Sequence, residues 1–116
     1  MVDAEDLAFQ RMEMIQTENP GAMTKHDIEE SEDTEWAVVT IADESGDNMS
    51  IEVIESDTSW KRSDLIDHYN ELAEDVEVAV ILPDEAFEEI AMRLAREGSP
   101  NIELLSYSDL GLIPRG

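Results

Sequence analysis

The sequence predicts an α/β domain (mixed α+β type) in which helices pack on a mixed four-stranded sheet. A β-branched segment at 36–42 and an alternating segment at 49–55, joined by polar turn residues, predict a β-hairpin. The nearly all-apolar segment 76–82 is typical of a strand covered on both faces. Helical patterns between the last three strands imply parallel pairing with right-handed crossovers. The predicted order is α-β-β-α-β-α-β, in a single α/β domain over residues 1–116.

The first helix is predicted over residues 4–18. Asp3 is suited to cap it, and apolar residues recur at helical spacing from Ala4 to Ile15. The turn residues 19–21 end it. The polar stretch 22–35 is predicted to be a loop, with at most one helical turn starting at Thr24.

The remaining elements follow from local patterns. In the hairpin, residues 43–48 form the turn, and the second strand carries Glu52 on a face open to water, with Ile54 interrupting the alternation. Ser63 is expected to cap a helix that ends near Glu74. A helix from Pro83-Asp84 to Gly98 and a strand at 102–107 complete the pattern, and the tail 109–116, apolar up to Ile113, is expected to pack.

Charge is the dominant feature of the composition. Thirty acidic residues against seven basic ones give a net charge of −23. For a sphere of roughly 17 Å radius, the electrostatic self-energy in salt-free water is on the order of 60 kcal/mol. At about 1 M salt, screening lowers it to roughly 10 kcal/mol. Domain stability is only about 5–15 kcal/mol, so the charge predicts a fold that depends on concentrated salt.

The distribution of the acids favours an adaptation to salt over a nucleic-acid mimic. A mimic would concentrate its acids on one face, whereas here they occur in every predicted element, and Lys25 and Lys61 are the only lysines. This composition resembles that of haloarchaeal cytoplasmic proteins. The resemblance implies a halophilic, archaeal, cytoplasmic protein whose acidity reflects its solvent more than its partner.

Several classes of function lack their sequence signals. The chain has no cysteine for disulfide, thiolate or Cys-ligated zinc chemistry. Its acidic start does not suit a signal peptide, and the longest apolar run, 78–82, is too short to span a bilayer, so no membrane association is expected. The five glycines form no phosphate-binding loop, so no nucleotide cofactor is expected.

The predicted hairpin carries the strongest candidates for chemistry. Asp43 at its turn and Glu52 on its second strand are carboxylates on adjacent strands, which is how proteins hold a divalent metal for phosphodiester hydrolysis. A first helix, a hairpin carrying these acids and the sequence IEVIES, and then α-β-α-β resemble the restriction-endonuclease-like (PD-(D/E)XK) superfamily.

That resemblance implies roles residue by residue. Asp43 matches the first acid of the family motif, Glu52 the second, and Glu5 the extra helical acid of some members. Ile54 occupies the position of the motif lysine, which positions the attacking water, and Lys61 is the nearest substitute. The sequence therefore favours a non-catalytic interaction or regulatory role on a degenerate nuclease-like fold, without a cofactor. The alternative is a Mg²⁺- or Mn²⁺-dependent nuclease that uses Asp43 and Glu52.

Three further patterns suggest partners. Trp60 beside Lys61 and Arg62 is suited to a stacked base and a phosphate backbone, although the lack of a basic stripe disfavours nucleic acid. Asp64 and His68 have the i, i+4 spacing of a metal pair, which is equally the spacing of a surface pair.

Met12 and Met14 cannot both face one core from an ideal helix. Either helix 4–18 presents a second face to a partner or a symmetry mate, as in a homodimer, or one of these methionines is simply exposed.

Overall fold

The computed structural model describes residues 2–115. In chain order the elements are α1 (Ala4–Glu18), β1 (Met23–Ser31), β2 (Thr34–Ala42), β3 (Met49–Ile54), the 3₁₀ turn η1 (Ser59–Lys61), α2 (Leu65–Ala73), β4 (Glu77–Leu82), α3 (Asp84–Glu97), β5 (Ile102–Ser106) and α4 (Tyr107–Leu110). The predicted fold class and order of elements are confirmed, with one strand and one short helix more than expected.

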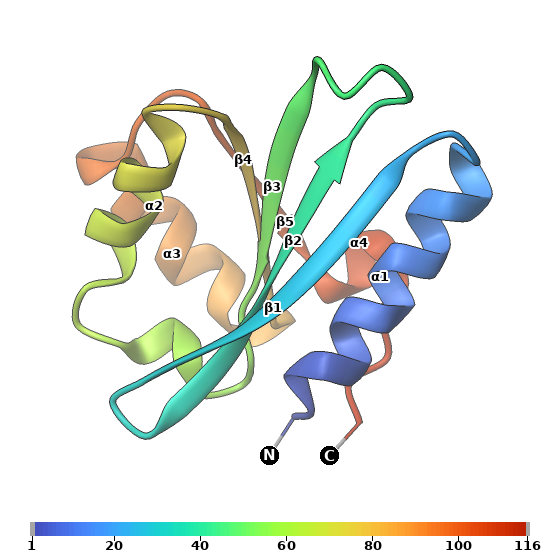
Figure 1. Cartoon of the computed structure of the whole chain (residues 1–116). Helices are drawn as coiled ribbons and strands as arrows, with labels where there is room; N and C mark the ends of the chain where they lie inside the picture. The colour runs from blue at the N-terminus through green and yellow to red at the C-terminus, as the bar shows by residue number, and fades with distance from the viewer. Residues whose placement is uncertain (1, 116) are drawn as a thin grey trace.

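Within residues 2–115, five strands form one mixed sheet in the order β1-β2-β3-β4-β5 (Figure 1). β1, β2 and β3 are antiparallel neighbours, whereas β3, β4 and β5 run parallel. The parallel pairing predicted for the last three strands is confirmed. The expected count of four strands is wrong, because the extra strand lies in the segment predicted to be a loop.

β1 is the largest error in the sequence-based prediction. Residues 23–31 pair without interruption with β2, from Met23 opposite Ala42 to Ser31 opposite Thr34. The turn between them consists of Glu32 and Asp33, both with positive φ, as a type I′ hairpin turn requires. The apolar alternation in β1 is limited to the half-buried Ile28 among polar side chains, so pairing with β2 stabilises a strand that its composition disfavours.

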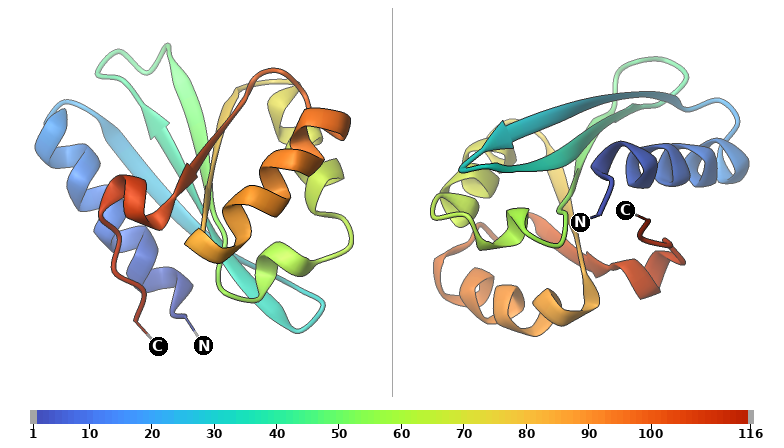
Figure 2. Two further views of the ribbon diagram at one scale, coloured as in Figure 1. Left: turned by 180° about the vertical axis from the view of Figure 1, so that it is seen from behind. Right: turned by 90° about the horizontal axis from the view of Figure 1, so that it is seen from below.

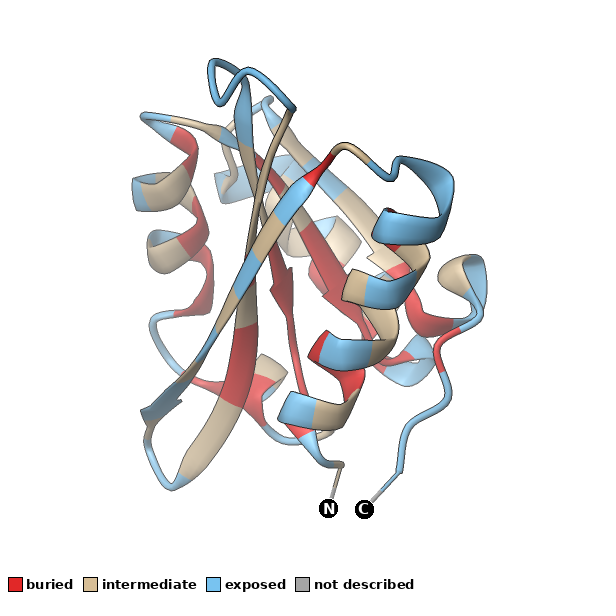
Figure 3. Ribbon diagram, turned by 45° about the vertical axis from the view of Figure 1, so that its right-hand side comes forward, coloured by how far each residue is buried: buried red, intermediate tan, exposed pale blue. Residues whose placement is uncertain are grey.

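The helices cover both faces of the sheet. Figure 1 shows α2 and α3 on one side, and α1 with α4 on the other. In the described chain, the buried apolar residues form two clusters on these faces. On the α2/α3 face they are Trp36, Val53, Leu65, Ile66, Tyr69, Ala73, Val78, Val80, Leu82, Ala86 and Ile90. On the α1/α4 face they are Ala4, Leu7, Ala8, Ala37, Val39, Ile54, Ile81, Tyr107 and Leu112. Buried positions concentrate on the central strands and on the helix faces turned towards them (Figure 3).

The predicted first helix is confirmed. Asp3 caps α1 by accepting a hydrogen bond from the backbone N–H of Asp6. The expectation that Met12 and Met14 face different surfaces is wrong, because both pack, half-buried, against the apolar cluster under α1. Unbranched, flexible thioethers reach the same cluster from two sides of the helix. The exposed large apolar residue of α1 is Phe9, at 52% exposure.

The later helices differ from the prediction mainly at their ends. Ser63 does not cap α2; Asp64 precedes the helix, and Ser63 instead donates its backbone N–H and its hydroxyl to the carboxylate of Glu32. α3 begins after Pro83 and ends before Gly98, as predicted.

The tail packs, as expected from its apolar residues. Leu112 is buried, and the backbone N–H of Asp3 donates to the carbonyl of Arg115 at 2.6 Å. The tail therefore runs beside the start of α1, and Figure 2 shows the two ends of the chain together. No helix within residues 2–115 is both long and apolar enough to cross a membrane.

Candidate functional site

Asp43 lies in the β2–β3 turn, where neighbouring side chains donate a hydrogen bond to each oxygen of its carboxylate. The Ser45 hydroxyl donates to one oxygen at 2.7 Å, and the Asn48 amide donates to the other at 2.6 Å. These hydrogen bonds, first that from Ser45 and then that from Asn48, lower the pKa of Asp43 to about 2. The local role of this acid is to fix the turn.

Glu52 is buried, which corrects the expectation that its face is open to water. The face that carries Glu52 and Ile54 lies under α1, and Glu52 is only 7% exposed. Arg11 on α1 donates two hydrogen bonds to the carboxylate, from Nε to Oε1 at 2.6 Å and from Nη2 to Oε2 at 2.9 Å. The pairing raises the pKa of Arg11, chiefly through the Glu52 hydrogen bond. A guanidinium therefore occupies the position of a cation at this carboxylate.

The structure does not bring Asp43 and Glu52 together. Asp43 follows Ala42, which pairs with Met49, whereas Glu52 pairs with Val39, four residues before Asp43 in the chain. At the rise of an extended chain, four residues correspond to about 13 Å, beyond the distance at which two carboxylates share one ion. Among residues 2–115, no group of three or more His, Asp or Glu side chains is arranged to hold a metal ion.

The positions beside Glu52 on the sheet are apolar. Its neighbours across the ladder are Val39 on β2 and Ala79 on β4. Ile54, at the position of the motif lysine, is fully buried. Glu5, expected as an additional helical acid, faces His26 on β1, with 3.4 Å between Oε2 and Nε2. None of these residues adds a ligand to Glu52.

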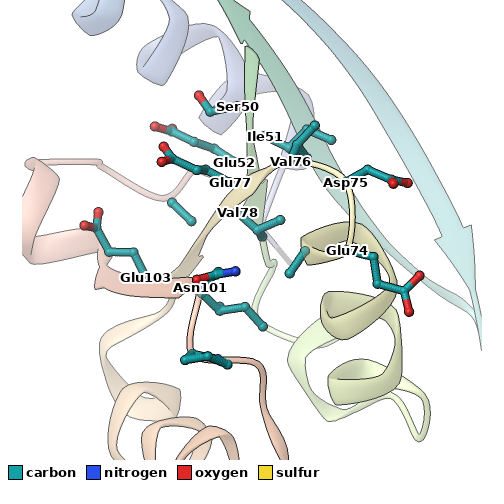
Figure 4. Close-up of a pocket in the computed structure, with 14 residues that line it drawn as sticks. Ser50, Ile51, Glu52, Glu74, Asp75, Val76, Glu77, Val78, Asn101 and Glu103 are labelled. Carbon is teal, nitrogen blue, oxygen red and sulfur yellow. The ribbon is translucent and has the colours of Figure 1, made fainter. Parts of the chain in front are cut away.

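An open cavity of about 900 Å³ lies next to Glu52, at the amino ends of β4 and β5. Its acidic lining consists of Glu52, Glu74, Asp75, Glu77 and Glu103. In Figure 4, Glu52 and Glu77 lie beside each other, while Glu74 and Asp75 point away from them. The cavity has the charge to attract cations, and Arg11 already neutralises the one of these acids that is buried.

A second carboxylate, Glu55, is the centre of a buried polar network that the sequence analysis did not predict. It follows β3 directly and is 0% exposed. Its Oε1 accepts hydrogen bonds from Arg62 Nη1 at 2.5 Å and from the Ser59 hydroxyl at 2.6 Å, and its Oε2 accepts from the Tyr69 hydroxyl at 2.6 Å. The Tyr107 hydroxyl donates to the Glu55 carbonyl. The network thereby joins η1, α2 and the start of α4 to the end of β3.

The two tyrosines of this network have raised pKa values. Burial raises the pKa of Tyr69 well above its ordinary value, and the nearby charge of Glu55 adds to the effect. Burial also raises the pKa of Tyr107. Both hydroxyls therefore stay protonated and act as hydrogen-bond donors to Glu55 at any physiological pH.

Arg62 belongs to this network, which separates it from Trp60 and Lys61. The Arg62 guanidinium stacks 3.5 Å from the Trp36 ring centroid, and its side chain is fully buried. Trp60 packs half-buried against the core and donates its indole N–H to the Asp57 carbonyl, which leaves Lys61 as the exposed member. The three residues proposed for nucleic acid therefore do not form a common exposed surface.

The same network accounts for the Asp64–His68 pair. His68 Nδ1 lies 3.2 Å from Arg62 Nη2, and Asp64 Oδ1 lies 3.5 Å from Arg62 Nε. Both residues thus face a guanidinium rather than each other across a shared ion. Two buried donors in this region, Trp36 Nε1 and Arg62 Nε, have no hydrogen-bond partner among the described residues.

A smaller cavity of about 200 Å³ lies at the carboxyl ends of the parallel strands, the usual ligand position in open α/β sheets. Two of its three acids already accept hydrogen bonds: Asp57 from the backbone N–H of Val2, and Asp84 from the backbone and hydroxyl of Ser108. These bonds lower the pKa of Asp84, with the Ser108 hydroxyl as the main cause. These hydrogen bonds hold Val2 and α4 in place.

Comparison of the chain with protein-family models, with curated proteins and with solved structures found no match.

Proposed function

We propose that this chain is a non-catalytic interaction domain, built on a degenerate nuclease-like fold and adapted to a cytoplasm of concentrated salt. The observation that carries the proposal is the two-point ion pair between Arg11 and Glu52. A metal-dependent nuclease needs carboxylates that converge on a hydrated ion. Here the guanidinium of Arg11 already pairs with Glu52, and the neighbours of Glu52 across the sheet are apolar.

The acidic surface supports adaptation to salt. The chain carries −23 net charges, and its acids are distributed over helices, strands and turns. At molar salt the Debye length falls to about 3 Å, so most of the self-repulsion of this surface is screened without a dedicated counter-ion site. The acids then serve hydration and solubility.

The surface suited to interaction consists of α1 and the adjacent strand β1. Phe9 is exposed on α1, and Met23 is exposed at the start of β1. β1 is at the edge of the sheet. Helix 4–18 therefore contributes to an interface, as its sequence suggested, through Phe9 rather than through Met12 and Met14. Nucleic acid is a less suitable partner, because Arg62 of the Trp60, Lys61 and Arg62 cluster is buried.

The alternative, a Mg²⁺- or Mn²⁺-dependent nuclease using Asp43 and Glu52, is tested by thermal unfolding. The melting temperature is measured in 2 M KCl with and without 10 mM MgCl₂ or MnCl₂, at matched ionic strength. We expect no shift for the wild type. A rise that Glu52→Ala abolishes, or metal-dependent DNA cleavage lost in the same variant, would favour the nuclease and overturn the proposal.

A further inference from the structure

The outer edge of β1 is a long, regular and open edge of the sheet. Among the described residues β1 pairs with β2 alone, over nine residues without a bulge or a proline. Its outward N–H and C=O groups are therefore available to another strand. Natural proteins usually protect such an edge with bulges, prolines or charged side chains. β1 has no bulge or proline, and its charges are of both signs, so a second strand can pair with them instead of being repelled.

The side chains of β1 alternate between two different surfaces. Lys25, Asp27 and Glu29 are exposed on one face of the strand. Thr24, His26 and Ile28 are half-buried on the face that α1 covers. Phe9 of α1 lies against His26, with their ring centroids 4.9 Å apart, and remains half exposed. An apolar and aromatic group thus lies directly beside the open edge.

We propose that this edge pairs with the same edge of a second copy of the chain, antiparallel and with the two-fold axis at His26. This inference rests on the proposed interaction role and names the partner. In this register each Lys25 lies opposite Asp27 of the second copy, which gives two complementary cross-strand pairs. The dimer would extend the sheet continuously across the axis.

Symmetric registers with the axis at Lys25, Asp27 or Ile28 place like charges opposite each other. An axis at Asp27 places the two Asp27 side chains directly opposite each other, and an axis at Lys25 does the same with the two lysines. Like charges directly opposite each other in a ladder are destabilising. An axis at Ile28 brings Asp27 opposite Glu29. The His26 axis is therefore the register that the sequence of β1 selects.

The His26 axis also brings the aromatic groups together. Each copy contributes a Phe9 and a His26 on the α1 face near the axis, so that pairing covers Phe9. The net charge of −23 per copy opposes association at low salt. That repulsion acts over long distances and is screened in brine, whereas ladder hydrogen bonds and apolar burial persist. Dimerisation should accordingly increase with salt.

The test is the molar mass of the full chain by light scattering and sedimentation equilibrium in 2 M KCl. We expect twice the 13.0 kDa of one chain. Lys25→Asp and Asp27→Lys, made separately, place like charges opposite each other and should each weaken the dimer several-fold in 2 M KCl, where salt screens part of the repulsion. Together they exchange the charges of each pair and should restore it. Lys61→Asp, the same change at the other lysine, should leave the mass unchanged.

The double variant is decisive for the register. If Lys25 instead met Glu29 of the second copy, Lys25→Asp with Asp27→Lys would not restore association. Cooperative unfolding in urea verifies that each variant folds. A second measurement is amide hydrogen exchange, which should slow in β1 as protein concentration rises.

A monomer at all concentrations would overturn the self-pairing, and so would a dimer indifferent to Lys25→Asp. Either result would leave the non-catalytic proposal standing, since that depends on the metal titration of Glu52.

Discussion

Arg11 and Glu52 connect α1 to the middle of the sheet through a two-point ion pair, with distances of 2.6 and 2.9 Å. Both side chains are largely buried, at 12% and 9% exposure. The pair lies between the core under α1 and the acidic cavity at the amino ends of β4 and β5. It therefore holds α1 against the sheet and also neutralises one of the five acids of the cavity wall.

Breaking this pair from one side should cost more stability than removing it altogether. Arg11→Met leaves Glu52 buried without its counter-charge, and we expect a loss of about 3 kcal/mol. Arg11→Met with Glu52→Leu should recover most of that loss, because apolar replacements of buried pairs are often neutral. Urea unfolding in 2 M KCl measures the free energies. The matched control is Arg115→Met, whose ion pair to Asp6 is exposed and long at 3.8 Å, with an expected effect below about 1 kcal/mol.

The Glu55 network should be the most sensitive polar cluster in the protein. Glu55→Gln leaves the buried Arg62 guanidinium without its charged partner and should destabilise the fold by about 3 kcal/mol or more. Tyr69→Phe removes one hydrogen bond to the same carboxylate and should cost about 1.5–3 kcal/mol. Glu88→Gln on the exposed side of α3 is the control, with little effect expected. Equal stability of Glu55→Gln and wild type would contradict the assigned role of Glu55.

The hydroxyls beside Asp43 and Asp84 should control the titration of these two acids independently. Carbon-detected NMR gives each carboxyl pKa. Ser45→Ala should raise the pKa of Asp43 from about 2 towards its ordinary value without affecting Asp84. Ser108→Ala should raise the pKa of Asp84 towards its ordinary value without affecting Asp43. Because the folded pKa of Asp43 is depressed, its contribution to stability is present above pH about 4 and is lost as the pH falls towards 2.

The salt requirement for folding should follow the electrostatic self-repulsion, which scales with the square of the net charge. Glu88, Glu89 and Glu97 are exposed on α3, and their replacement by Gln changes −23 to −20, which removes about a quarter of the self-repulsion. The KCl concentration needed for cooperative folding should therefore fall. Glu→Asp at the same three positions keeps the charge and should leave that concentration almost unchanged. Full cooperativity and unchanged heat resistance of the wild type in dilute buffer would contradict this account.

Strong local patterns made most of the fold predictable from the sequence. The helix 4–18, the hairpin and the crossover helices each carry a periodicity that the structure reproduces. β1 carries none of comparable strength, because five of its nine residues are charged or histidine and its stability comes from pairing with β2. Its position at the edge explains why an unfavourable composition is tolerated there.

The polar sites were less predictable, because they depend on contacts between residues distant in sequence. Glu52 and Arg11 are 41 residues apart, and no local signal joins them. Glu55 and Arg62 are closer, seven residues apart. In a chain with thirty acids, however, one more acid at the end of a strand is inconspicuous. The sequence feature that indicates this network is Arg62, because the chain has only five arginines and a buried one needs an acidic partner.

The stacking of Arg62 on Trp36 gives the protein an optical reporter. This indole is buried against a guanidinium at 3.5 Å, while Trp60, the second tryptophan, lies half-buried beside Lys61. Replacing Trp60 by Phe leaves Trp36 as the sole tryptophan emitter. Its fluorescence then changes when the guanidinium departs from the ring, so opening of the carboxyl end of β3 becomes measurable in real time, separately from the detachment of α1.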